Sequence, residues 1–359
     1  MSADLTEKVE SIKGQLRAAD AALAQALDAR AEAIKRAIEL RDEHPDAYIG
    51  MPRDVDVLSE LSERIEHFPV DAAKPVMREV LSACAAMVAP VEVAYMGVEG
   101  GLGHTAARKY FGSAARFRSA PSAEEVVAEV ERKRASRGVL PWETSNDGTV
   151  TATLNALAHS DLKIGGEVTV KARYHMLSQS GDPAQIKTIL GTPTAIAAAE
   201  RFVLTRFADA RIVDTRTGIN AADQAAKDPE AAAICTEVVA QLTNLEFVQR
   251  SVQDSTSHEI RYVVAGGDAP ARTGADRTAI VLATHDAPGE LMACLKPLAD
   301  RRVNLTRLET RAARGVPWRY FILMEMEGHI TDRSVLTAVE EVRATNRNIQ
   351  VLGSYPRPE

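Results

Sequence analysis

The sequence predicts a multidomain protein in which an all-α region comes first, a two-lobed α/β region follows, and a small α+β domain of βαββαβ order ends the chain. Three observations predict this: helical periodicity persists to about residue 41, strand-like alternation begins after residue 90, and a segment rich in turn formers and charge covers residues 270–276. We therefore place the domains at residues 1–90, 91–270 and 277–359.

Helical periodicity defines the first region. From Asp4 to about Arg41 the chain has no proline and a single glycine, and apolar residues recur at helical spacing until His44-Pro45. Two further helices are expected, from about Arg53 to Ile65 and from Asp71 to Val88. Three helices with too few residues for a closed core favour pairing with a second chain, so we expect a homodimer or a higher homo-oligomer.

Composition narrows the class of partner. The formal net charge of −7 and the pI near 5.7 argue against nucleic acid, which requires concentrated positive charge, so an anionic ligand must be small. The cysteines, Cys84, Cys235 and Cys294, lie far apart, and we expect no disulfide, metal or cofactor. No secretory signal and no apolar run of roughly 18 residues is present, which predicts a cytoplasmic protein without a membrane partner.

The central region alternates strands with helices. A strand over Val91–Met96 enters the glycine-rich segment Gly97–Ala107 and a helix from about Thr105 to Tyr110, an arrangement that points backbone N–H groups at an anion. A helix near Ser122–Ser136 and a strand ending at Pro141 complete a βαβ unit. The same alternation continues through residues 186–233, so we expect two lobes with the ligand between them at the carboxyl ends of strands.

One segment, Gly138–Val150, organises this region. It is a short apolar strand that we expect to stop at Pro141, followed by a polar turn. The turn exposes several polar side chains beside a glycine, and such a turn can present side-chain and backbone donors to one small anion. These side chains are Glu143, Thr144, Ser145 and Asp147, beside Gly148.

The last region reads as strand, helix, strand, strand, helix and strand. This order predicts a small antiparallel sheet with two helices on one face. The expected bounds are Thr278–Thr284, Gly289–Asp300, Val303–Arg311, Arg319–Glu327, Asp332–Ala344 and Ile349–Ser354.

Cationic positions on the first helices resemble the helical chorismate mutase module. The positions are Lys13, Arg30, Arg41 and the pair Arg53-Asp54. The resemblance implies that they clamp two carboxylates during a pericyclic rearrangement, which needs cations and a donor at the ether oxygen rather than a nucleophile. Val88 stands where the module has the glutamine or glutamate that reaches the ether oxygen, and valine donates no hydrogen bond.

Four stretches of the central region resemble a prephenate dehydratase domain, and the order of regions resembles the bifunctional chorismate mutase/prephenate dehydratase family over nearly the whole chain. The stretches are 93–100, 138–150, the strand with His175-Met-Leu177, and 254–262. The resemblance implies conversion of prephenate to phenylpyruvate in phenylalanine biosynthesis, with mutase activity in doubt. The implied catalytic residues are Glu143, Thr144, Ser145 and Arg261, and the implied substrate contacts are Gly100, Gly101, Gly148, Thr149 and His175.

The sequence departs from the family at several polar positions. Thr144 replaces an asparagine, Gly101 and Gly103 replace hydroxyl residues of the first turn, Ile260 replaces the threonine of a Thr-Arg-Phe motif, and Gly191-Thr-Pro-Thr194 replaces Ser-His-Pro-Gln. Isoleucine cannot donate the proton that the leaving hydroxyl needs.

Three interpretations of these departures remain open. His258 and Glu259 supply a relocated general acid, unless His258 is only a surface histidine. Alternatively, Arg261 still binds a substrate carboxylate while the pocket performs different chemistry on prephenate or chorismate in a specialised pathway. The third possibility is a regulator that binds ligand without turnover. Trp142 either narrows the pocket or packs in the core.

The final region resembles the ACT domain, which in this family binds phenylalanine as a feedback signal. Two stretches carry the resemblance, Pro288–Leu291 and Asn304–Arg311. The implied effector-binding residues are Gly289, Leu291, Asn304, Leu305, Glu309 and Arg311. The alternative is a dimerisation domain with an inactive effector site.

Overall fold

A computed structural model describes residues 3–44, 57–58, 60, 64–283, 287–312, 320–346 and 348–357. The chain forms two compact units, each described by itself below. One unit comprises Met1–Val91 with Phe111–Ala115, and the other comprises Glu92–Tyr110 with Arg116–Glu359.

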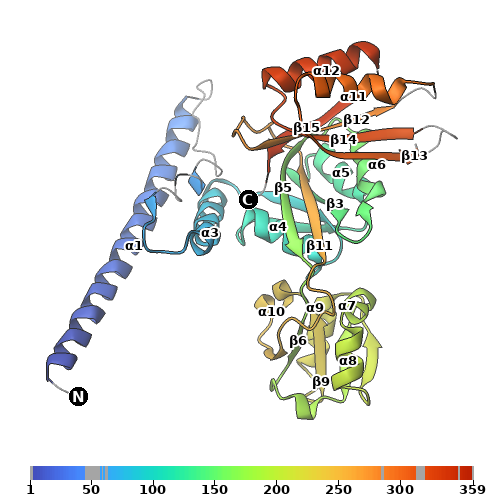
Figure 1. The fold of residues 1–359 in the computed structure, drawn as a ribbon. Coiled ribbons are helices and arrows are strands. Elements are labelled where there is room, and N and C mark those ends of the chain that lie inside the picture. The colour runs from blue at the N-terminus through green and yellow to red at the C-terminus, as the bar shows by residue number, and fades with distance from the viewer. Residues whose placement is uncertain are drawn as a thin grey trace. The chain divides into compact units, whose positions relative to one another are not determined.

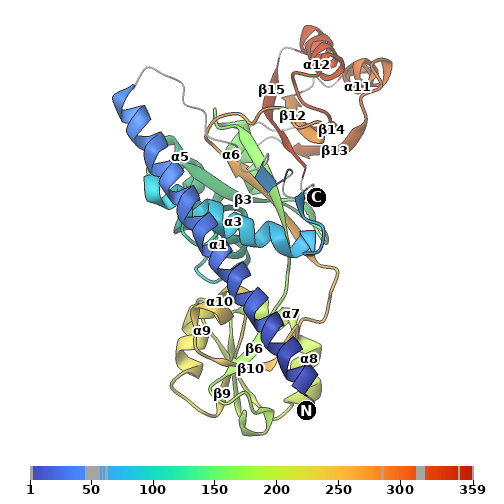
Figure 2. The same cartoon turned by 90° about the vertical axis from the view of Figure 1, so that its left-hand side faces the viewer.

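The first unit is helical. α1 (Ala3–Glu43) is a single unbroken helix, and α3 (Val70–Val88) packs against it (Figures 1 and 2). Both helices agree with the helical periodicity of the sequence. The helix expected over Arg53–Ile65 lies largely outside the described residues. Residues 111–115 join this unit through hydrogen bonds to α3, such as that from Ser113 N to Glu79 Oε2 at 2.9 Å.

The second unit begins with a mixed sheet of strand order β2-β1-β3-β11-β5, with β4 paired to β3. β1 is parallel to β2 and β3, whereas β11 is antiparallel to β3 and β5. The strands are β1 (Glu92–Met96), β2 (Arg116–Ala120), β3 (Arg137–Thr144), β4 (Gly148–Thr149), β5 (Ile164–Lys171) and β11 (Glu259–Ala265). The helices of this lobe are α4 (Leu102–Phe111), α5 (Ala123–Glu131) and α6 (Thr151–Ala158).

Strand β3 does not stop at Pro141, contrary to the expectation from the sequence. It continues to Thr144, and the register against β11 shifts between Arg261 and Tyr262, so that Pro141 lies at a bulge. On its other side β1 pairs with β3 only as far as Val139. The missing N–H of proline therefore interrupts no regular ladder at this point, which is where a strand tolerates proline.

The second lobe is built on a sheet of order β10-β6-β9-β7-β8 with helices around it (Figure 2). The chain crosses between the lobes twice, after β5 and before β11. The strands are β6 (His175–Ser178), β7 (Thr188–Gly191), β8 (Arg211–Asp214), β9 (Ala231–Cys235) and β10 (Glu246–Gln249). The helices are η1 (Pro183–Gln185), α7 (Pro193–Ala198), α8 (Glu200–Arg206), α9 (Gly218–Ala225) and α10 (Glu237–Leu242).

The C-terminal domain has the βαββαβ order expected from the sequence. Its antiparallel sheet runs β13-β14-β12-β15, and α11 and α12 lie side by side on one face (Figure 1). The other face shares a core with the first lobe, where Leu140 and Trp142 pack with Leu323 and Tyr355. The elements are β12 (Asp276–Ala283), α11 (Glu290–Asp300), β13 (Leu305–Ala312), β14 (Tyr320–Glu327), α12 (Arg333–Thr345) and β15 (Ile349–Pro356).

Among the described residues, no helix is both long and apolar enough to cross a bilayer.

Candidate functional site

The β3–β4 hairpin forms the centre of the candidate site. Glu143 pairs with Thr149 and Thr144 with Gly148, whose φ of 74° suits a glycine in a tight turn. The Thr144 hydroxyl donates to Asp147 Oδ2 at 3.0 Å and accepts from Asp147 N at 2.9 Å. Thr144 therefore closes its own turn, much as an Asx or Ser/Thr turn does.

Strand β11 begins beside the tip of this hairpin. Ser145 N donates to Glu259 O at 2.9 Å, and the Ser145 hydroxyl donates to Ser257 O and accepts from Glu259 N at 3.1 Å. These bonds bracket His258, whose Nε2 is buried and has no hydrogen-bond partner among the described residues. Ile260 pairs directly with Thr144 across the two strands. The tip thus combines Ser145 and His258 with an apolar neighbour.

The glycine-rich turn after β1 is held by close packing. A Cβ on Gly103 would lie 2.1 Å from Met96 O, so no hydroxyl-bearing side chain fits there without a backbone shift. Gly100 has a φ of 75°, and its carbonyl accepts a hydrogen bond from the Thr236 hydroxyl of the second lobe at 2.6 Å. The predicted substrate contacts Gly100 and Gly101 therefore lie where the first lobe meets the second.

His104 fixes this turn from inside the lobe. Its Nδ1 accepts a hydrogen bond from Gly100 N at 3.1 Å, and its ring stacks on Tyr95 with 5.0 Å between the ring centroids. Burial, together with the nearby Arg108 cation, lowers the pKa of His104 to about 4. The neutral imidazole that results is the form able to accept the Gly100 N–H.

His175 is a buried residue of the second lobe. Its Nδ1 accepts a hydrogen bond from Ser251 N at 3.2 Å, and its ring meets Phe247 edge-on. Burial lowers the pKa of His175, and its Nε2 has no hydrogen-bond partner within the described part of the chain. His175 thus contacts Ser251, which lies in the segment that returns toward β11.

Below the hairpin tip, charged side chains of the first lobe and the C-terminal domain form one connected network. Arg261 bonds to Glu143, Glu167 and Glu325, at distances of 2.7–3.1 Å. Trp142 Nε1 also donates to Glu325, and Trp142 is fully buried, so it packs in the core. The network contains the guanidiniums of Arg261, Arg277, Arg307 and Arg311 and the carboxylates of Glu143, Glu167, Glu309 and Glu325.

Burial and pairing set the ionisation of this network. Burial raises the pKa of Glu167, although Arg261 and Arg277 oppose the shift. For Glu309 burial also acts upward, but hydrogen bonds from Thr149 and Arg307 outweigh it and lower the pKa. The carboxylates around Arg261 raise its pKa despite burial, so it stays a cation.

The predicted site residues separate into groups in the structure. The ionic network contains residues from both predicted sites. Those expected at the substrate are Glu143, Thr149 and Arg261, and those expected at the effector are Glu309 and Arg311. The other predicted effector residues flank the start of α11 and the start of β13. Gly289 has a φ of 88°, Leu291 is exposed, and Asn304 and Leu305 lead into β13.

The helical cations are placed only in part. Lys13 pairs with Glu10 at 2.8 Å on the exposed surface of α1, and Arg30 Nη1 is buried without a hydrogen-bond partner among the described residues. Arg41 lies in α1 at a position whose side chain is outside the described atoms, and Arg53 and Asp54 fall outside the described residues. Val88 ends α3 and is exposed.

Sequence reasoning missed Glu167, Arg277, Arg307 and Glu325. Each is a charged residue within a strand of alternating or apolar character, as in Leu323-Met-Glu-Met326. Because charges are rarely buried unless they are paired, such interior charges are a usable signal for a buried ionic cluster.

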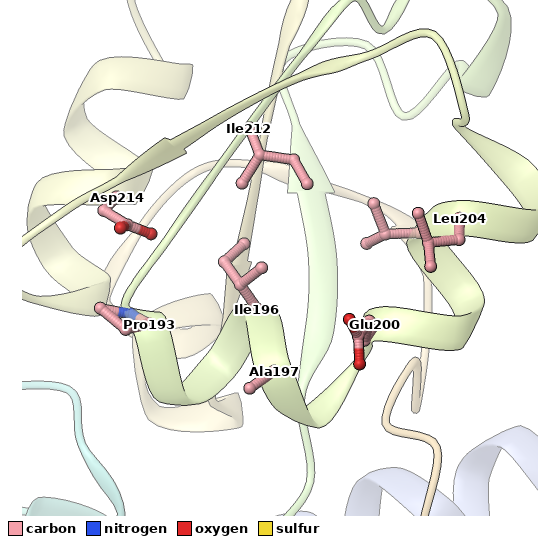
Figure 3. A pocket seen from close by; sticks show the side chains of 8 residues that line it. Pro193, Ile196, Ala197, Glu200, Leu204, Ile212 and Asp214 are labelled. Carbon is pink, nitrogen blue, oxygen red and sulfur yellow. The ribbon is translucent and has the colours of Figure 1, made fainter.

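A shallow pocket of about 300 Å³ lies elsewhere, on the second lobe (Figure 3). Ile196, Leu204 and Ile212 form its apolar wall, and the carboxylates of Glu200 and Asp214 lie at opposite sides. Of the residues predicted for the site from the sequence, none lines it. In the described ranges there is also no group of three or more side chains suited to a metal ion.

The protein has two lobes built on mixed sheets, joined by two crossings of the chain, and a βαββαβ domain follows them. This architecture places it among two-lobed α/β proteins with an added C-terminal domain. The chain belongs to the prephenate dehydratase family. The model of that family, Prephenate dehydratase, matches residues 93–269, which span both lobes. The prephenate dehydratase of Mycobacteroides abscessus is 32% identical over 243 residues, or 67% of this chain and 79% of that protein.

Two further comparisons extend the likeness. The bifunctional chorismate mutase/prephenate dehydratase of Aquifex aeolicus is 28% identical over 357 residues, 98% of each chain. A solved structure of prephenate dehydratase from Arthrobacter aurescens in complex with L-Phe is 29% identical and has a TM-score of 0.65, covering 74% of this chain and 90% of that one. The likeness to bifunctional proteins thus includes the helical N-terminal region.

Proposed function

We propose that this protein converts prephenate to phenylpyruvate in phenylalanine biosynthesis. Membership of the prephenate dehydratase family carries the proposal, because the family match spans the lobes that hold the hairpin and the glycine-rich turn. In this reaction the ring carboxylate leaves as carbon dioxide, its bonding electrons move into the ring, and the ring hydroxyl takes up a proton and leaves as water. The protein must therefore hold the substrate and deliver one proton.

We assign the proton delivery to the hairpin tip. Ile260 offers no proton, and the Thr144 hydroxyl is used within its own turn. His258 lies between two residues that bond to Ser145, and its Nε2 has no partner among the described residues. A protonated His258 would give its proton to the leaving hydroxyl, while Ser145, through its bonds to Ser257 O and Glu259 N, holds the loop that carries His258.

The test is direct. Purified protein incubated with prephenate should form phenylpyruvate, measured by its ultraviolet absorbance in alkali, above the rate of a protein-free control. His258→Gln should lower kcat by about a hundredfold, the lower range for loss of a general acid. His67→Gln, which changes an exposed histidine of the helical unit, should leave the rate unchanged. Product formation no faster than the protein-free control would rule out the proposed activity.

For the helical unit we propose chorismate mutase activity at Lys13, Arg30, Arg41, Arg53 and Asp54. The nearly full-length likeness to a bifunctional relative supports it, whereas Val88 removes a donor that the module normally supplies. Incubation with chorismate, followed by mass spectrometry for prephenate and phenylpyruvate, distinguishes a working module from a purely structural one.

We propose that the C-terminal domain is an ACT domain that binds an amino-acid effector, with phenylalanine as first candidate. Its βαββαβ order and the L-Phe complex of the Arthrobacter aurescens protein support this. Calorimetric titration with L-Phe, and with L-Tyr as comparison, tests it. A Gly289→Val variant should weaken the binding, because the φ of 88° at Gly289 disfavours a β-branched residue.

One observation favours a second candidate, a regulator that binds prephenate without turnover. Ile260 and Gly103 both lack the hydroxyl of the family pattern, and the close approach of Met96 O at Gly103 leaves no room for one. Heat release on titration with prephenate, together with unchanged prephenate after long incubation, would favour this second candidate over the enzyme. A product of different mass would instead show other chemistry at the same site.

A further inference from the structure

The base of the β3–β4 hairpin contacts the C-terminal domain on both strands, through an ion pair on β3 and hydrogen bonds on β4. On β3, Glu143 Oε2 lies 3.2 Å from Arg307 Nη1. On β4, the Thr149 hydroxyl accepts a hydrogen bond from Arg307 and donates one to Glu309. One side chain of β13, Arg307, therefore contacts both strands of the hairpin.

The guanidinium of Arg261 is fully engaged by carboxylates of the protein. Its Nε donates to Glu143 at 3.1 Å, its Nη1 to Glu167 at 3.0 Å, and its Nη2 to Glu143 at 2.8 Å and to Glu325 at 2.7 Å. Every nitrogen of Arg261 thus already donates to a carboxylate. The sequence resemblance assigns this arginine to the substrate, but its contacts fit the role of a clamp on Glu143.

Burial restrains the side chains that hold Glu143, which is itself partly exposed. The side chains of Glu325 and Arg307 are 2% and 8% exposed, and Arg261 is 12% exposed. In a low-dielectric interior, paired charges hold fixed positions because any separation leaves an uncompensated charge. The hairpin tip, which carries Thr144 and Ser145, is consequently set by side chains of β13 and β14.

We propose that Arg307 and Glu325 of the C-terminal domain are positioning residues of the dehydratase site. They act through Glu143 and Arg261, and they fix the hairpin whose tip holds the loop that carries His258. The inference rests on the proposed function, because it assigns to these residues a role in that reaction. It extends the site to a domain outside the matched family region, residues 93–269.

The kinetic test compares three variants of the full-length protein. Glu325→Gln keeps the shape and removes the charge, Arg307→Met keeps much of the apolar stem, and Glu327→Gln is the matched control. Glu327 lies on the same strand and pairs with Arg357 near the surface. We expect the first two to lower kcat about tenfold or more with KM changed less than about threefold, because small misplacement of an orienting group slows the chemical step. The control should keep the wild-type kcat.

A conservative variant and a structural measurement separate positioning from loss of folding. Arg307→Lys should recover part of the kcat lost in Arg307→Met, because it restores the cation without the fork geometry. Hydrogen exchange of the peptide covering residues 142–150 should speed up in Glu325→Gln and stay at the wild-type rate in Glu327→Gln. If Glu325→Gln does not fold, the charge-balanced variant Glu325→Gln/Arg307→Gln is compared in its place.

The outcomes distinguish the inference from the proposed function. A wild-type protein inactive on prephenate overturns the proposed function, and the hydrogen exchange of the hairpin then decides the positioning on its own. In an active protein, unchanged kcat in Glu325→Gln overturns the positioning role. A lowered kcat without faster exchange of the hairpin also overturns it, because the effect would then reach the site by another route.

Discussion

Ile260 faces Thr144 across β3 and β11, at the position where the Thr-Arg-Phe motif has its threonine. If the missing hydroxyl limits the reaction, Ile260→Thr should raise kcat for prephenate by about a hundredfold, the lower range for a positioned proton donor. The variant buries a hydroxyl at a site that is 9% exposed, so thermal unfolding should show a loss of about 1–3 kcal/mol.

Val264→Thr is the matched control, since Val264 is a buried residue of the same strand paired with Val139, away from the hairpin tip. It should lower stability without raising kcat. An equal gain in both variants, or none in Ile260→Thr, would move attention to Gly101 and Thr144, the other altered positions of the family pattern.

His104 gives a pH dependence of stability. Its folded-state pKa of about 4 lies below the ordinary value of 6.5, so the unfolded chain binds the proton first as pH falls. The stabilisation is therefore fully present above about pH 6.5 and is lost as pH falls toward about 4, with a slope of at most about 1.4 kcal/mol per pH unit from this group. Urea unfolding should show His104→Gln to be less sensitive to this range than wild type. An equal dependence in both proteins would contradict the assignment.

At the residue scale, the sequence indicates individual polar residues of interest more readily than it indicates which other residues they contact. The polar residues Glu143, Thr149 and Arg261, predicted for the substrate site, lie together in the ionic network, and Ile260 lies opposite Thr144. The bond from Arg261 to Glu325 is not predictable from the sequence, because the two strands meet only through the tertiary fold. The same holds for Trp142 and Glu325, which lie 183 residues apart in the sequence. Local periodicity contains no information on such pairing.

At the element scale, the turn between β1 and α4 depends on glycine. A Cβ at Gly103 would lie 2.1 Å from Met96 O, whereas one at Gly165 in β5 would meet only atoms at 3.8 Å or more. We expect Gly103→Ala to lower the free energy of unfolding by about 1–3 kcal/mol through overpacking, and Gly165→Ala to have a much smaller effect. Urea unfolding of the two variants measures the difference. Equal stability of the two would mean that the turn relaxes freely.

The elements themselves follow from the sequence with errors at their ends. α5 stops at Glu131 rather than near Ser136, because the chain turns there and Lys133 takes a left-handed φ of 58°. α4 begins at Leu102, before the expected Thr105, since the glycine-rich segment itself enters the helix. β3 passes through Pro141 because a bulge lies beside it. These boundaries depend on backbone turns and on strand pairing, which local propensity does not describe.

At the scale of the whole molecule, the order of helical, two-lobed and βαββαβ regions is predictable, because strand-like alternation replaces helical periodicity after residue 90 and turn formers mark residues 270–276. How these regions pack against one another is not predictable from the sequence. A hydrophobic core shared by Leu140 and Leu323 joins the first lobe to the C-terminal domain, and the ionic network lies in the same unit. Residues 270–276 are rich in turn formers, as a linker is, yet the sheets on either side of them pack together and should unfold cooperatively.

The surface of α1 predicts association with a second copy of the chain. One stripe of apolar side chains, spaced at helical intervals, is 42–60% exposed: Leu5, Ile12, Leu16, Leu23 and Leu27. Leu16→Glu/Leu23→Glu places charges on this stripe, whereas Ala18→Glu places one on the opposite face of the same exposed helix. If the stripe is a dimer contact, the double variant should weaken association by about a hundredfold or more, since each buried leucine contributes about 1.5–3 kcal/mol. Sedimentation equilibrium of the wild type and of both variants measures the association. Ala18→Glu should keep the wild-type mass. A wild-type protein that is monomeric at every concentration measured would refute association through α1.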